Sequence, residues 1–213
     1  MKLNENMLRL YAVTDRSWLR GETIFDQVEA AIRGGATLIQ LREKELPFDA
    51  FLDEAIEMKA LCERCNVPLI INDNVEIALR SGADGVHVGQ DDMRAADIRK
   101  MAGRNLIVGV TAKTVEQALD AQAAGADYLG SGAVFGSSTK TNARPMTRET
   151  LSAICAAVDI PVVAIGGINR NNISELRGTG ISGVAVVSGI FAAEDIEAEC
   201  RLLLDLARKV SGR

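Results

Sequence analysis

The sequence predicts an α/β fold, a single (β/α)8 barrel (TIM barrel) that occupies residues 1–213 as one domain. Three observations predict it. Eight short apolar runs alternate with longer amphipathic stretches in strict βα order. Successive runs lie roughly 25 residues apart, which matches the repeating unit of a closed parallel barrel. The last two runs each stop in small residues, Gly166-Gly167 and Ser188-Gly189, where such barrels commonly bind phosphate.

The elements follow one another without an obvious linker or low-complexity tract. Strands are expected at residues 8–14, 38–41, 68–71, 85–88, 106–110, 128–135, 162–165 and 184–187. Helices are expected at residues 24–33, 48–65, 75–81, 115–124, 148–158, 171–177 and 195–210. Glycines at 35, 82, 125 and 180 each end a helix directly before a strand. The alternative is a doubly wound open sheet, but no G-x-G-x-x-G follows the first strand.

The composition narrows the class of protein. Hydrophobic residues make up 47% and aromatic residues only 4%, with 19 glycines, so we expect an aliphatic, tightly turned core. The net charge of -5 argues against a nucleic-acid partner. No run approaches the ~20 apolar residues of a membrane span, and we expect a cytoplasmic protein without a membrane partner. Cys62 and Cys65 form a C-x-x-C inside a predicted helix, where packing thiols are favoured over a zinc or redox site.

Reactive residues of a barrel lie where strands end and the following loops begin. Arg42 and Lys44 alternate along the end of the second strand, so both cations are expected on the same side, in the barrel interior. A phosphate would neutralise them, although Arg42 could instead pair with a carboxylate of the barrel. Lys140 follows the small polar segment Gly136-Ser-Ser-Thr139. That loop could bend over a pyrophosphate, or it could be an ordinary solvated loop.

Two carboxylates are expected at the same rim of the barrel. Asp73 follows the third strand and Asp92 follows the fourth, and carboxylate oxygens are the ligands that Mg²⁺ prefers. Each aspartate could instead cap the helix that it precedes. His87, the only histidine, is expected to be a hydrogen-bonded residue of the barrel mouth, with a catalytic base as the alternative.

Together these residues resemble the thiamine phosphate synthase family from Leu10 to about Phe191. The motifs that carry the resemblance are Tyr11-Ala-Val-Thr-Asp15, Gln40-Leu-Arg-Glu-Lys44, Asn72-Asp73, Asp84-Gly-Val-His-Val-Gly-Gln-Asp-Asp92, Gly109-Val-Thr-Ala-Lys113, Asp127-Tyr-Leu-Gly130, Ser137-Ser-Thr-Lys140, Ala164-Ile-Gly-Gly-Ile168 and Val187-Ser188. Any one of these motifs would be weak, but their number and order make the resemblance specific.

The resemblance implies a transferase of thiamine biosynthesis that joins hydroxymethylpyrimidine diphosphate to hydroxyethylthiazole phosphate and releases pyrophosphate. It implies a dissociative mechanism, Mg²⁺ as cofactor and small molecules as partners, and it leaves a homo-oligomer open. The matching catalytic positions are Arg42, Lys44, Thr111 and Lys140. The matching substrate-binding positions are Gln40, Asn72, Ser137, Thr139, Gly167, Val187 and Ser188. The matching metal ligands are Asp73 and Asp92.

Three positions depart from the family pattern. Thr111 stands where serine is usual, Lys113 stands where histidine is usual, and Phe135-Gly-Ser-Ser-Thr replaces the common Pro-Thr-x-Thr. Two rivals share the fold: a thiazole tautomerase and a non-catalytic sensor of thiazole phosphate. The tautomerase would need its histidine at the position of Lys113, and a sensor of a monophosphate has no use for the whole diphosphate set. Both comparisons favour the synthase.

Overall fold

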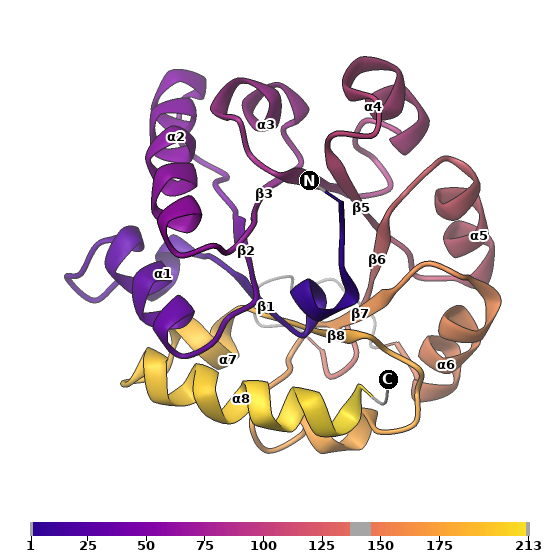
Figure 1. Ribbon diagram of the computed structural model, residues 1–213. Coiled ribbons are helices and arrows are strands. Elements are labelled where there is room, and N and C mark those ends of the chain that lie inside the picture. The colour runs from indigo at the N-terminus through magenta and orange to yellow at the C-terminus, as the bar shows by residue number, and fades with distance from the viewer. Residues whose placement is uncertain (1, 137–145, 212–213) are drawn as a thin grey trace.

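The protein is described here by a computed structural model that covers residues 2–136 and 146–211 (Figure 1). Within these residues, eight parallel strands close into a barrel in which neighbours follow sequence order and the last strand pairs with the first. The strands are β1 (Leu10–Val13), β2 (Leu38–Leu41), β3 (Leu69–Asn72), β4 (Gly85–Val88), β5 (Ile107–Thr111), β6 (Tyr128–Gly132), β7 (Val162–Ile165) and β8 (Gly183–Val186). The predicted (β/α)8 barrel is therefore confirmed.

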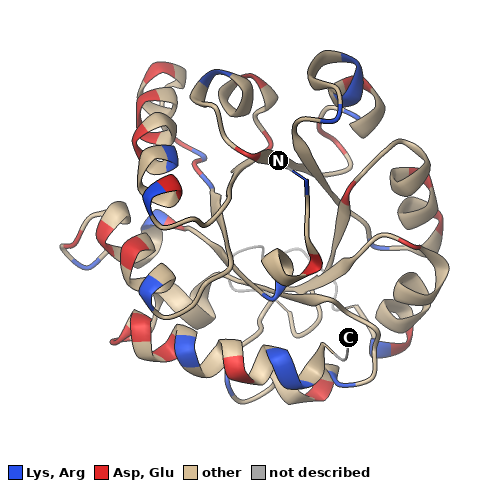
Figure 2. Ribbon diagram, viewed as in Figure 1, with Lys and Arg blue, Asp and Glu red and all other residues tan. Residues whose placement is uncertain are grey.

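Helices surround the barrel on its outside (Figure 1). They are α1 (Ile24–Arg33), α2 (Phe48–Arg64), α3 (Val75–Ser81), α4 (Ala95–Ala102), α5 (Val115–Ala123), α6 (Arg148–Ala157), α7 (Ser188–Phe191) and α8 (Ile196–Val210). The described residues also form three short 3-10 helices, η1 (Glu5–Leu8), η2 (Arg16–Trp18) and η3 (Ile173–Leu176). Basic and acidic residues are interspersed along the outer helices, with both signs on α2 and α8 (Figure 2). Among the described residues, no helix is both long and apolar enough to cross a membrane.

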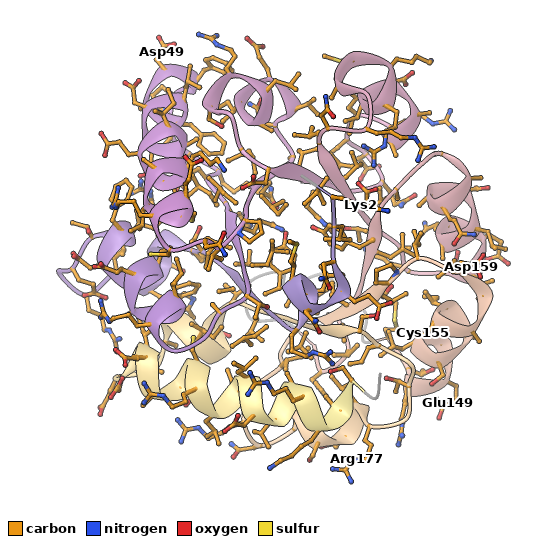
Figure 3. All side chains as sticks on the ribbon, viewed as in Figure 1. Lys2, Asp49, Glu149, Cys155, Asp159 and Arg177 are labelled. Carbon is orange, nitrogen blue, oxygen red and sulfur yellow. The ribbon has the colours of Figure 1, made fainter. Side chains whose placement is uncertain are left out.

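Side chains pack in two buried layers. The larger lies between the strands and the helices, and the smaller fills the barrel interior with residues such as Leu38, Ile70 and Val163. Figure 3 shows that side chains occupy the centre of the ring, which looks open in the ribbon view, while Asp49 and Arg177 project from the periphery. The floor of the barrel is closed by η1, whose Leu8 is fully buried in the interior layer.

Helix boundaries follow local capping. Thr23 and Asp26 form a reciprocal capping box at α1, with Asp26 N–H donating to Thr23 Oγ1 at 3.1 Å. The hydroxyl of Thr114 caps α5, and the carboxylate of Asp195 caps α8. Such caps supply the hydrogen bonds that the first turn of a helix cannot make within itself, so the chain turns from loop to helix at these residues.

Some elements differ from the sequence predictions. The first strand begins at Leu10 rather than at residue 8, because Leu8 belongs to the turn that closes the floor. The sixth strand ends at Gly132 rather than at residue 135, since its partner β7 ends at Ile165, opposite Gly132. In the predicted helix at residues 171–177 only η3 forms, and side chains of Asn169 and Asn172 bond nearby backbone instead. Helix α7 was not predicted, and α4 was expected only as a helix after Asp92, without bounds.

Candidate active site

A cavity of about 360 Å³ opens at the carboxyl ends of the barrel strands. Nine of the predicted site residues line it: Gln40, Arg42, Asn72, Asp73, Asp92, Thr111, Gly167, Val187 and Ser188. Lys44 does not line the cavity itself but contacts Asp73, which does. Ser137, Thr139 and Lys140 lie outside the described residues. The structure thus brings the described candidates together at one mouth, as the register of the barrel requires.

Arg42 is held at the mouth by the loop that follows β1. Its guanidinium lies 3.3 Å from the carboxylate of Asp15, and both side chains are largely buried. The backbone N–H of Arg42 donates to the hydroxyl of Thr14 at 3.0 Å. The pairing with a barrel carboxylate, considered from the sequence as an alternative for Arg42, is therefore present. Because Arg42 also lines the cavity, the same pair orients its guanidinium toward any anion that enters.

Asp73, Lys44 and Asp92 form a charged group on the neighbouring strands. Lys44 Nζ lies 2.6 Å from Asp73 Oδ2. Burial works to raise the pKa of Asp73, but the hydrogen bond and charge of Lys44, together with hydrogen bonds to Asp92 and Asn72, outweigh it, and the pKa lies below its usual value. Burial also raises the pKa of Asp92, and the nearby charge of Asp73 adds to this against the hydrogen bond from Gly89 N–H. The two carboxylates therefore interact directly, with one lysine beside them.

Neither carboxylate caps a helix. Asn74 is the residue that caps α3, with its Oδ1 accepting from Ile77 N–H at 3.0 Å, and Asp73 precedes it with a left-handed φ of 62°. Helix α4 begins after Arg94, without a side-chain cap, and Asp92 instead accepts from Gly89 N–H at 2.7 Å. The capping alternative is wrong for both aspartates. An aspartate in the left-handed region at a cavity is typical of a site whose geometry serves a ligand.

The charged residues that line the described part of the cavity are predominantly acidic. Two cations, Arg42 and Lys113, face three carboxylates, Asp73, Asp91 and Asp92. Among the described residues there is no group of three or more His, Cys, Asp or Glu side chains placed to hold a metal ion. The pair Asp73 and Asp92 could therefore supply two ligands, and a metal ion there would complete its shell from other molecules.

Glycine-rich backbone forms the opposite wall of the cavity. Gly166 and Gly167 follow β7 with φ of 103° and 67°, a region that other residues rarely adopt. Asn172 Nδ2 donates to the carbonyl of Gly167 at 2.9 Å and fixes the loop. A Cβ on Gly189 would lie 2.4 Å from the carbonyl oxygen of Ile168, so the loops after β7 and β8 pack backbone to backbone. Such a wall lets an anion approach main-chain N–H groups.

His87 is a hydrogen-bonded residue of the barrel mouth. Its Nδ1 lies 3.1 Å from Tyr128 Oη and its Nε2 lies 3.1 Å from Thr111 Oγ1. Tyr11, which also lines the cavity, contacts Tyr128 at 2.9 Å between the two hydroxyl oxygens. Sequence reasoning did not single out either tyrosine or the role of Asp15 beside Arg42. The signal available was position: Tyr11 lies in the middle of one predicted strand and Tyr128 begins another, and both belong to the interior layer.

The cysteines lie away from the cavity. Cys62 is buried in α2 and Cys65 is exposed at its end, and neither forms a disulfide; the same holds for Cys155 and Cys200. Burial raises the pKa of Cys62 to about 12, which leaves it protonated and unreactive at neutral pH. The expectation of a packing thiol is confirmed for Cys62, whereas Cys65 is exposed and does not pack in the core.

The family model and the curated relatives point to one family. A family model described as thiamine monophosphate synthase matches residues 10–190. A thiamine-phosphate synthase of Ruminiclostridium cellulolyticum is 51% identical over 197 residues, which cover 92% of this chain and 94% of the relative. A thiamine-phosphate synthase 2 of Streptococcus pneumoniae is 46% identical over 202 residues, or 95% of this chain and 96% of the relative.

Solved structures agree with the sequence comparisons. The thiamine phosphate pyrophosphorylase from Pyrococcus furiosus superposes with a TM-score of 0.90 at 38% identity, over 98% of this chain and 99% of the other. A structure described as native KDPGal reaches a TM-score of 0.72 at 19% identity, over 99% and 98% of the two chains. The second likeness shows the barrel fold alone.

Proposed function

The chain belongs to the thiamine monophosphate synthase family, and on that premise we propose how its residues carry out the reaction. The protein is a transferase of thiamine biosynthesis that condenses 4-amino-2-methyl-5-hydroxymethylpyrimidine diphosphate with 4-methyl-5-hydroxyethylthiazole phosphate. The products are thiamine phosphate and pyrophosphate. The observation that carries the proposed site is the direct contact of Asp73 with Lys44 and its interaction with Asp92, beside Arg42 at the barrel mouth.

Arg42, Lys44 and Thr111 bind the diphosphate of the pyrimidine substrate in this proposal, with Gln40 and Asn72 contacting the same substrate. Arg42 and Thr111 line the cavity, and Lys44 reaches its rim through Asp73, which supports this role. Lys140, Ser137 and Thr139 lie outside the described residues, and they enter the proposal through the family motif Ser137-Ser-Thr-Lys140.

Asp73 and Asp92 are the proposed ligands of a Mg²⁺ ion. Their chemistry fits the ion: two interacting carboxylates need a positive charge between them, and the charged lining of the described cavity is predominantly acidic. A divalent metal ion bound there would supply positive charge to the diphosphate as it leaves. Lys44 holds Asp73 in its ionised form, because the hydrogen bond keeps the pKa of that carboxyl low.

The thiazole phosphate binds the glycine-rich wall formed by Gly166, Gly167, Val187 and Ser188. The bond between the pyrimidine methylene carbon and the diphosphate oxygen breaks first, and both electrons leave with pyrophosphate. Arg42, Lys44 and Lys140 stabilise the departing anion. The thiazole nitrogen then donates its electron pair to the pyrimidine-methyl cation and forms the new C–N bond. Because the thiazole nitrogen is itself the nucleophile, no protein nucleophile is needed, and the site has only to keep water from the cation.

Several further expectations from the sequence belong to the same proposal. Residues 1–213 act as one domain, and the two substrates, rather than a nucleic acid or a membrane, are its partners. We also infer a cytoplasmic location, which suits a biosynthetic enzyme like the relatives that the chain resembles. A homo-oligomer is compatible with all of these expectations.

The experiment that tests the proposal follows both products. Purified protein is mixed with the two substrates and Mg²⁺, and thiamine phosphate and pyrophosphate are quantified over time. We expect equal amounts of the two products, loss of both with EDTA, and recovery when Mg²⁺ is restored. Product formation that is insensitive to EDTA would reject the metal site, and binding of thiazole phosphate without any product would reject the synthase reaction.

A further inference from the structure

Five polar side chains form a continuous chain of hydrogen bonds across the barrel interior, here called the interior chain. It runs from Gln40 on β2 to Tyr11 on β1, Tyr128 on β6, His87 on β4 and Thr111 on β5. Both ends, Gln40 and Thr111, line the cavity, whereas Tyr128 is fully buried beneath it. The interior chain therefore connects Gln40 and Thr111, two residues of the proposed substrate site, partly through Tyr128, which cannot touch a substrate.

Glycine on β5 makes room for this chain. Gly109 lies in register between His87 on β4 and Tyr128 on β6. A Cβ at Gly109 would lie 2.2 Å from Tyr128 Cζ and 2.5 Å from His87 Nδ1. A Cβ at Gly130 would lie 2.9 Å from His87 Cε1. Only glycine lets the two rings meet across the intervening strand, so the contact is built into the register of the barrel.

The chemistry of the end group gives the chain a direction. The Nε2 of Gln40 is a donor only, so Tyr11 Oη accepts from it and must direct its own single proton to Tyr128. Tyr128 then directs its proton to His87 Nδ1. Burial raises the pKa of both tyrosines well above the usual value, so each phenol keeps one proton to give.

An Nδ1 that accepts leaves the proton of a neutral imidazole on Nε2, which faces Thr111 Oγ1. We propose that the interior chain is a positioning device for the reaction: it holds His87 as the Nε2–H tautomer, so that Thr111 accepts from His87 and turns its own hydroxyl proton toward the substrate. His87 and Tyr128 are positioning residues in this arrangement. Because the proposed function supplies a diphosphate at this mouth, the acceptor of the Thr111 hydroxyl is an oxygen of that leaving group, and this part rests on the proposed function.

The opposite direction would have the opposite effect. If Gln40 presented its carbonyl oxygen to Tyr11, every proton in the chain would reverse, and His87 would carry its proton on Nδ1. Thr111 would then donate to His87 Nε2 and would have no proton left for the substrate. The tautomer of His87 therefore reports which way the chain runs.

The tautomer can be read directly, because His87 is the only histidine of the sequence. The protein is produced without a histidine tag and labelled with ¹⁵N-histidine. The two imidazole nitrogens of His87 are then observed by NMR at neutral pH. We expect the Nε2–H tautomer in the unsubstituted protein. In Gln40→Glu the carboxylate can only accept, so the proton should move to Nδ1. Ser131→Ala is the matched control: it removes another buried hydroxyl of β6, one outside the chain, and should leave the tautomer unchanged.

Kinetics test the consequence for Thr111. Thr111→Val should lower kcat at least tenfold, since it removes a hydrogen bond to a charged leaving group, and Thr111→Ser should restore most of it. Tyr128→Phe should lower kcat by roughly tenfold with little change in KM, because Tyr128 acts only through His87. Ser131→Ala should match the unsubstituted protein in both constants.

The outcomes separate this inference from the proposed function. An Nδ1–H tautomer or an imidazolium in the unsubstituted protein overturns the direction of the chain, whether or not thiamine phosphate forms. An unchanged tautomer in Gln40→Glu overturns the coupling between the two ends, and a normal kcat in Tyr128→Phe overturns its effect on the reaction. An Nε2–H tautomer in a protein that makes no thiamine phosphate would leave the chain standing and reject the proposed function. The spectrum of the unsubstituted protein decides the direction even if a variant fails to fold.

Discussion

Glu43 gives the stability of the protein a pH dependence that can be worked out from the structure. It stands between Arg42 and Lys44 at the end of β2, and the alternation of the chain turns it outward from the barrel. There it lies 2.7 Å from Arg16, which also pairs with Glu54 of α2. The side chain of Glu43 is only 2% exposed, and one carboxylate oxygen of each glutamate is buried without a hydrogen-bond partner among the described residues.

Burial raises the pKa of Glu43 from 4.5 to about 7, Arg16 works against that rise, and the charge of Glu54 adds to it. The folded protein therefore binds this proton more tightly than the unfolded chain does. The resulting stabilisation is fully present below pH 4.5 and is lost as the pH rises through about 7. Each pKa unit corresponds to about 1.4 kcal/mol, so the free energy of unfolding should fall by up to about 3 kcal/mol across this range.

The assay is urea unfolding at a series of pH values from about 4 to 8, followed by circular dichroism and by the fluorescence of Trp18. Trp18 is the only tryptophan and ends the same 3-10 turn as Arg16, so it reports on this region. Glu43→Gln cannot titrate and should lose the decrease. Glu76→Gln, an exposed glutamate that pairs with Arg80 on α3, is the control and should follow the unsubstituted protein. Parallel curves for the unsubstituted protein and Glu43→Gln would refute the reasoning.

Three further predictions concern the site and the fold. Asp92→Asn keeps an oxygen that can accept from the N–H of Gly89 but removes the negative charge. It should lower the metal-dependent kcat by at least roughly 100-fold without changing the melting temperature. Near-normal turnover would remove Asp92 from the metal site. Gly109→Ala forces a Cβ to within 2.2 Å of Tyr128 Cζ. It should lower the free energy of unfolding by about 3 kcal/mol or more, measured by urea unfolding, and a loss below about 1 kcal/mol would contradict the close contact. Thr23→Ala removes the cap of α1 and should cost about 1 kcal/mol in the same assay, with no change in kcat; an unchanged midpoint would show that the cap adds nothing.

The sequence was most informative about the fold, because the signals of a parallel barrel are local. Helices α1 and α3 have the predicted bounds, and strands β2, β4 and β7 begin and end at the predicted residues. Errors arose where tertiary contacts decide an element. Leu8 is the first residue of the apolar run that predicted the first strand, but in the structure it belongs to the turn that closes the floor of the barrel. Side chains of Asn169 and Asn172 bond backbone and prevent the helix that the apolar spacing indicates.

The site was predictable in part for the same reason. Alternation past the end of β2 predicted Arg42 and Lys44 in the barrel interior; Arg42 lines the cavity, whereas Lys44 is half exposed and reaches only Asp73 at its rim. Whether Asp73 caps a helix could not be decided, since Asp73 and Asn74 are both good caps and the left-handed φ of Asp73 is not visible in the sequence. The contact of Tyr11 with Tyr128 joins residues 117 positions apart. It depends on barrel closure and on the space left by Gly109, which no local pattern contains.

Two cations at the mouth of the cavity, Arg42 and Lys44, are already paired with carboxylates. Arg42 lies against Asp15 and Lys44 against Asp73, so each cation meets a carboxylate before any substrate is present. These pairs keep long, flexible side chains in the orientation that an anion requires, and little side-chain entropy is then lost on binding. The same pairs leave the described part of the mouth without excess positive charge. Binding of a diphosphate therefore calls for further positive charge, which the family motif offers in Lys140 and which a metal ion on the interacting carboxylates Asp73 and Asp92 would also supply.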